Sequence, residues 1–240
     1  ATKGEADKTM NLGFEADGSF VFKFGRNRSY SDIELKTDTK YGNNTEWHHW
    51  ACVYELNVGR KIYRDGQLVA QDKETKPFSG HSRKFVFGMG MINNSYNGWL
   101  TGKLDEFRVW KTARTAQQIK ANMNILSSIT PDLQFYTKFD KAQNNKMYNE
   151  VTKKFDTSFN NGVQLSSANE TKCNPTSKPI NTNVNNVLDF CRSNGFVDLG
   201  TAGINGNQAS YKIPTIEFKA RRLDNNKEEI FRTRTLGLNP

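Results

Sequence analysis

The run Trp47-His48-His49-Trp50-Ala51-Cys52-Val53-Tyr54 is followed closely by Arg60-Lys61-Ile62-Tyr63-Arg64-Asp65-Gly66-Gln67-Leu68-Val69-Ala70. The first stretch is apolar on both faces, which is typical of a central strand in a sheet. The second stretch divides at Asp65-Gly66, a dipeptide that favours the tight turn of a β-hairpin. Together they predict a buried strand followed by a two-stranded hairpin.

The same period-two pattern recurs along the chain, with turn residues between the segments. A hairpin is expected at Asp17-Gly18, followed by a strand with three phenylalanines on one face. The strand from Leu100 is expected to place Leu104, Glu106, Arg108 and Trp110 on one face. Further strands are expected near residues 32–37, 84–89, 132–140, 187–190, 196–200, 215–220 and 229–232. This pattern predicts an all-β fold.

One short helix interrupts this pattern. It is expected to begin after Thr115 and to run to Met123, since Thr115 and Gln118 have the spacing of a capping box. The polar residues 124–131 follow, and Pro131 blocks any continuation of the helix.

The composition suits one large sandwich or two small domains, with 240 residues of which 35% are hydrophobic. No run approaches the roughly 18 apolar residues of a membrane span. No signal peptide opens the chain, so the sequence is mature, a fragment, or not secreted.

The chain is basic, with a net charge of +9 and a pI near 9.4. The basic residues lie singly along strands and turns, so a nucleic-acid-binding arm is not expected. This charge either attracts an anionic partner or forms an ordinary solvated surface.

None of the three cysteines has the spacing of a zinc or redox site. Cys52 is expected to be a small core residue. Cys173 and Cys191 flank a polar loop and either form a disulfide in an oxidising compartment or remain free thiols. Glycosylation sequons, which in so Asn-rich a chain are either sites or accidents, stand at Asn27, Asn43, Asn93 and Asn169.

Taken together, these segments resemble the laminin-G-like (concanavalin-type) family. The Trp47 strand, the Asp65-Gly66 hairpin and the strand Gly102–Trp110 with its helix are similar to the closing half of such a domain. Residues 132–140, 187–199 and 215–218 resemble the opening half. The resemblance covers nearly all of the chain and implies a two-sheet antiparallel jelly-roll sandwich with one short helix.

The two halves stand in swapped order relative to that family. Residues 1–123 correspond to the closing half, 124–131 to a linker, and 132–240 to the opening half. In one interpretation both halves form a single compact, circularly permuted sandwich. In the other, the chain is a window cut from a tandem array, and open sheet edges lead to strand exchange and polymers.

Catalytic residues are not expected. His48 and His49 are adjacent on a strand and therefore point to opposite faces, so they cannot bind one metal ion together without help from elsewhere. A sandwich glycosidase needs two facing carboxylates, and acids such as Asp65, Asp105 and Glu106 do not form the Glu-x-Asp-x-x-Glu pattern of the family's enzymes. The nearest strings begin at Glu5 and Glu15, and both lack the second glutamate.

Ligand binding is expected from exposed aromatic residues and rim loops. One site is expected at Tyr96 and Trp99, and a second at Arg26, Arg28 and Tyr30, where arginine pairs with sulfate or carboxylate. The alternatives are that Trp99 is a core residue that closes the sandwich and that the Arg26 loop is only a solvated hairpin connection. The resemblance also implies a calcium ion at the rim, with Asp105, Asp189 and Asp198 as conceivable ligands.

The sequence therefore predicts a non-catalytic, extracellular recognition or adhesion module that binds carbohydrate or protein. One alternative is a structural subunit of an extracellular filament, built by self-association through strand exchange. The other is a sandwich-fold glycosidase or lyase.

Overall fold

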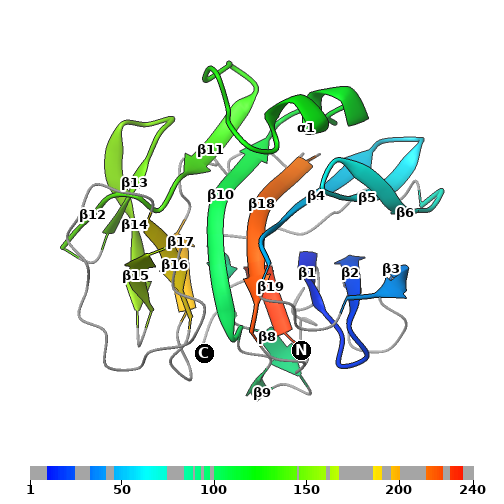
Figure 1. The fold of residues 1–240 in the computed structure, drawn as a ribbon, viewed down its shortest axis with the longest axis horizontal. Helices are drawn as coiled ribbons and strands as arrows, with labels where there is room; N and C mark the ends of the chain where they lie inside the picture. Colours follow the sequence, from blue (N-terminus) through cyan, green and yellow to red (C-terminus); the bar gives the residue numbers. More distant parts are fainter. Residues whose placement is uncertain are drawn as a thin grey trace, which may run out of the picture.

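The computed structural model describes residues 10–24, 33–41, 46–74, 84–88, 90–92, 95–97, 100–144, 146–160, 163–167, 186–190, 196–200, 215–223 and 228–234. These residues form antiparallel sheets with a single helix, which confirms the predicted all-β class (Figure 1). Within these ranges, no helix has the length and apolar character that crossing a membrane requires.

Sheet A contains nine strands among the described residues, in the order β12-β13-β14-β17-β7-β19-β1-β2-β3. Its strands are β1 (Met10–Phe14), β2 (Ser19–Phe24), β3 (Ile33–Lys40), β7 (Lys84–Phe87), β12 (Ala142–Gln143), β13 (Lys146–Asn149), β14 (Lys154–Asn160), β17 (Phe196–Gly200) and β19 (Glu228–Arg234).

Sheet B runs in the order β15-β16-β10-β18-β4-β5-β6, and β11 also pairs with β10. Its strands are β4 (His48–Glu55), β5 (Gly59–Arg64), β6 (Gln67–Gln71), β10 (Gly102–Trp110), β11 (Leu133–Thr137), β15 (Gln164–Ser167), β16 (Asn186–Asp189) and β18 (Thr215–Arg222). β8 (Gly90–Ile92) and β9 (Ser95–Asn97) form a separate pair.

Strands from both ends of the sequence alternate in both sheets. In sheet B, β18 lies between β10 and β4, so the run Thr215–Phe218 pairs directly with the tryptophan-histidine strand, and Phe218 is opposite Trp50. In sheet A, β19 lies beside β1 (Figure 1). The order of the halves relative to the family remains a prediction.

The core lies between the two sheets. Phe20 of sheet A stacks on Trp50 of sheet B, with ring centroids 4.2 Å apart. Phe87 of sheet A meets Phe107 of sheet B at the same centroid distance, 4.2 Å. Such aromatic pairs fix the spacing of the sheets and contribute beyond their buried area.

The local turn and cap signals are confirmed. Asp17-Gly18 and Asp65-Gly66 lie in the turns of their hairpins, and both glycines have the positive φ that such turns require. α1 (Ala116–Asn122) begins at Thr115, whose side chain completes the capping box with Gln118. Ile119 of α1 packs on Ala51, Val53 and Tyr63, so the helix covers the outer face of sheet B.

Residues 124–131 join α1 to β11, which pairs with β10. Leu126 packs against the buried cluster around Trp110, and the Lys111 amide donates to the Asp132 carbonyl. This segment is therefore a connection within sheet B. Cys52 is a buried free thiol, and burial raises its pKa. Cys173, Cys191 and the four sequons lie outside the described residues.

The expected alternation of β10 is wrong at its centre. The ladder between β10 and β18 shifts between Asp105 and Arg108, and Glu106 has a φ of 53°. Because this bulge adds one residue, Leu104 faces the core while Glu106, Arg108 and Trp110 lie on the outer face.

Candidate functional site

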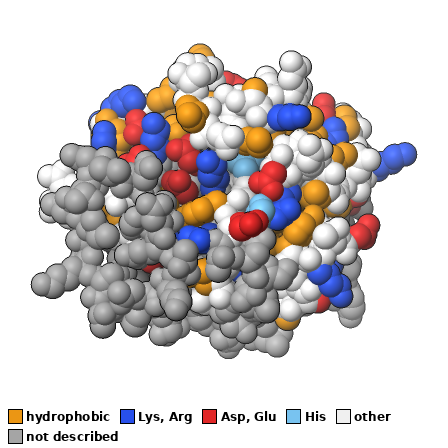
Figure 2. All heavy atoms as spheres, viewed as in Figure 1, with side chains coloured by type: hydrophobic (Ala, Val, Ile, Leu, Met, Phe, Trp, Pro, Cys, Tyr) orange, Lys and Arg blue, Asp and Glu red, His pale blue; other side chains and the backbone are white. Residues whose placement is uncertain are grey.

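Charged side chains gather on the outer face of sheet B, which we call the polar face. Side chains alternate along each strand, so the core-facing Trp50, Phe218 and Leu104 leave their neighbours pointing outward. Two rows then cross the strands β4, β18 and β10: Ala51–Glu217–Arg108 and His49–Lys219–Asp105. Figure 2 shows histidine, acidic and basic side chains side by side over the middle of the molecule, where these strands run in Figure 1.

Glu217 is the centre of a buried ionic network. Its side chain is fully buried, with Arg114 Nε 3.0 Å from one carboxylate oxygen and an Arg108 nitrogen 3.6 Å from the other. His49, which is 3% exposed, has its Nε2 3.8 Å from the same carboxylate. Two arginines therefore offset the charge of Glu217, as burial of an ion requires.

Glu106 is held in the bulge of β10 by two donors. The Arg108 guanidinium and the Tyr136 hydroxyl, at 2.7 Å, both donate to its carboxylate. Arg108 also donates to the Asn122 carbonyl at the end of α1 (2.8 Å). A bulge of this kind re-aims a side chain, and here it turns Glu106 toward Tyr136.

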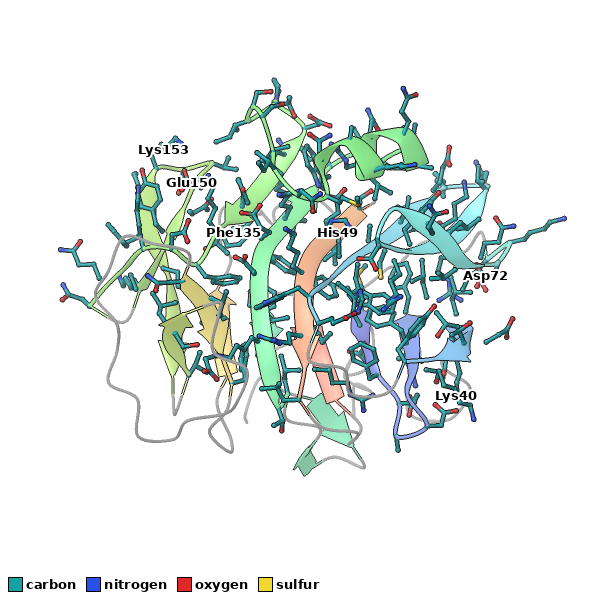
Figure 3. All side chains as sticks on the ribbon, viewed as in Figure 1. Lys40, His49, Asp72, Phe135, Glu150 and Lys153 are labelled. Carbon is teal, nitrogen blue, oxygen red and sulfur yellow. The ribbon has the colours of Figure 1, made fainter. Side chains whose placement is uncertain are left out.

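Four half-buried acids lie together beside this network: Asp105, Glu106, Asp140 and Glu150, here called the acidic cluster. Burial, and then the charge of Glu106, raise the pKa of Asp105 to about 7. Burial and Glu106 also raise the pKa of Asp140, with a smaller contribution from Glu150. Figure 3 shows Glu150 beside Lys153, and the two side chains form an ion pair of 3.2 Å. The cluster therefore contains one carboxyl, that of Asp105, which is partly protonated at neutral pH.

The two histidines point to different surroundings, as predicted. His48 Nδ1 lies 2.8 Å from Asp65 Oδ2, and an Arg64 nitrogen lies 2.7 Å from His48 Nε2. Arginine can only donate, so Nε2 accepts and the proton is on Nδ1. Both ring nitrogens of His48 are thus engaged in holding the β5–β6 hairpin.

Most of the predicted ligand-binding residues, Arg26, Arg28, Tyr30 and Trp99, lie outside the described residues. Tyr96 lies in β9 opposite Met91, and its side chain is not described. These rim sites remain predictions.

The acids suggested for calcium lie on different sheets. Asp105 and Asp189 belong to sheet B, whereas Asp198 belongs to β17 of sheet A. Asp189 forms an ion pair with Lys103 at 3.3 Å. In the part of the chain that the structure describes, no group of three metal-ligating acids, histidines or cysteines is found. A calcium site remains a prediction.

Sequence reasoning did not find the centre of the polar face. Arg108, Arg114, Tyr136 and Glu217 were not proposed as site residues, because they lie on separate segments that only the sheet pairing brings together. One local signal was present: Glu217 alternates with the apolar Ile216 and Phe218 in a strand buried on both faces.

The family comparison agrees with this architecture. The model of a laminin G family, described as the concanavalin A-like lectin/glucanases superfamily, matches residues 1–120. No curated protein and no solved structure matches the chain. The matched half contains β1 to β10, while the resemblance of residues 132–240 to an opening half remains a prediction. On this match, together with the two antiparallel sheets, the chain belongs to the concanavalin A-like lectin/glucanase superfamily.

Proposed function

We propose that this chain is a non-catalytic, extracellular recognition module that binds carbohydrate at the acidic cluster of the polar face. The observation that carries the proposal is the gathering of Asp105, Glu106, Asp140 and Glu150 on one half-buried surface of a chain with a net charge of +9. Asp105 and Glu106 of β10 have Asp140 and Glu150 beside them, and such a gathering of acids calls for an explanation because like charges repel.

Hydroxyl groups of a sugar supply such a reason. Ionised carboxylates accept charge-assisted hydrogen bonds from hydroxyls, and a protonated carboxyl such as Asp105 can also donate one. Because Asp105 is partly protonated at neutral pH, it suits a ligand whose hydroxyls both donate and accept. The remaining basic surface would raise the rate of encounter with an anionic matrix or cell surface.

A binding role is favoured over hydrolysis by the ion pairs of the two glutamates on the polar face. Glu217 is fully buried between two arginines, and Glu106 is engaged by Arg108 and Tyr136. A nucleophile or general base needs access to the substrate and free lone pairs. Neither glutamate has both.

A glycosidase is the second candidate, favoured by Asp105. Its raised pKa, about 7, is that of a general acid, and Glu106 is an adjacent carboxylate. This alternative differs from binding in one respect: the ligand would be consumed.

The experiment is a glycan array probed with the wild-type chain, with and without EDTA, followed by reducing-end assays on any glycan that binds. We expect binding that Asp105→Asn weakens at least severalfold, with no release of sugar ends. Asp38→Asn is the matched control, because Asp38 is an exposed acid on the edge strand β3. Retained binding in Asp105→Asn would contradict the proposed surface, and sugar release that Asp105→Asn abolishes would favour the glycosidase. Loss of binding in EDTA would support the calcium prediction.

A further inference from the structure

Two residues before Asp105 on β10, next to the acidic cluster, three polar side chains meet in a site without solvent. Lys103 of β10 and Asp189 of β16 are direct partners in the strand register, and Ser166 lies on the next strand, β15. Lys103 Nζ is 3.3 Å from Asp189 Oδ2 and 2.8 Å from Ser166 Oγ. All three residues are 0% exposed. Lysine is almost never buried to this extent, so the arrangement is unusual.

We propose that Lys103 and Asp189 become covalently joined in the folded protein, through an amide bond between Nζ and Cγ. The ion pair first becomes neutral when Nζ passes one proton to the carboxylate. The amine then attacks Cγ, the new C–N bond forms, and one C–O bond breaks. The departing oxygen leaves as water with two of the three ammonium protons, so no oxidant or other reactant is needed.

Two physical conditions favour this step. Keeping both charges away from water is energetically costly, whereas the amide has no charge. The register also holds the amine against the carboxyl, and such fixed proximity replaces an encounter in solution. Ser166 contacts Nζ and is placed to relay a proton to the departing oxygen, because its hydroxyl can both accept and donate.

The bond would connect β10 to β16 and close a loop over residues 104–188. Like a disulfide it would restrict the unfolded chain, but reducing agents would not break it. This inference is independent of the proposed carbohydrate site.

The first test is the intact mass of the purified, folded chain after prolonged incubation at neutral pH. We expect a mass lower than that of the sequence by one water molecule, and a branched peptide joining the Lys103 and Asp189 segments after proteolysis. Asp17-Gly18 and Asp65-Gly66 can also lose water by closing on their own backbone, so the branched peptide is the decisive signal. Lys103→Arg keeps the positive charge and should restore the full mass.

The second test uses a protease site placed in the connection 124–131, which lies between the two residues. After cleavage and denaturation in SDS, the cross-linked chain should run as one band and Lys103→Arg as two. A full-mass wild-type chain that separates into two fragments would overturn the proposal. This outcome is read on the wild-type chain alone, so it does not depend on whether the variant folds.

Discussion

At the scale of single residues, the polar face contains two kinds of acid. Glu217 is buried and neutralised by Arg108 and Arg114, so its role is to fix these arginines on the sheet. Asp105 is half-buried beside Glu106. Burial and the charge of Glu106 disfavour the ionised form of its carboxyl and so raise its pKa. The first kind stabilises the face, while the second is the kind found at functional sites.

Asp105 should make the protein less stable as the pH rises. Its pKa rises from 3.8 to about 7 on folding, so between these values the native state keeps a proton that the unfolded chain has lost. The contribution of Asp105 to the free energy of unfolding is therefore fully present below the pKa of the unfolded state. It is lost as the pH rises through the pKa of the folded state, by about 4 kcal/mol at most. Asp105→Asn cannot ionise and should lack this loss.

Urea unfolding of wild type and Asp105→Asn from about pH 4 to pH 8 measures the difference. Asp38→Asn controls for the removal of one negative charge. Identical pH profiles for wild type and Asp105→Asn would refute the assigned environment of Asp105.

At the scale of elements, α1 protects part of the outer face of sheet B. Its seven residues are too few to be stable alone, so the cap and the contact of Ile119 with Ala51, Val53 and Tyr63 must hold it. Because Arg108 donates to the last residue of this helix, α1 also helps to position the polar face.

Thr115→Ala should destabilise the protein by about 0.5–2 kcal/mol, because it leaves an amide of the first helical turn without its side-chain acceptor. Thr115→Ser keeps the hydroxyl and should recover most of the loss. The measurement is denaturant unfolding followed by tryptophan fluorescence. A variant as stable as wild type would mean that the capping box contributes nothing.

Whether an element could be predicted from the sequence depends on how few consecutive residues determine it. The Asp65-Gly66 hairpin and the Thr115 cap depend on a few consecutive residues, and both are confirmed. The bulge at Glu106 carries no local signal, since an ordinary residue adopts a positive φ there. The polar face depends on β18 lying between β10 and β4, and alternation within one strand cannot reveal this order.

At the scale of the whole molecule, the two parts of the chain are interleaved. Cleavage of an engineered site within 124–131 should therefore leave both fragments associated in native buffer, eluting from gel filtration with the intact chain. Lys103→Arg is the suitable background, because it removes the proposed covalent link. Fragments that separate without denaturant would contradict the single sandwich, because β18 could then not be paired between β10 and β4.

The pairing of β1 with β19 has a mechanical consequence. Asn11 lies opposite Arg232, and Phe14 lies opposite Glu228, so the start of β1 and the end of β19 are at the same end of one antiparallel pair. Tension applied through these two strand ends would load the backbone hydrogen bonds one after another, as in opening a zipper, and would not shear them all together. This module would consequently yield at low force along that direction, while sheet B remained folded.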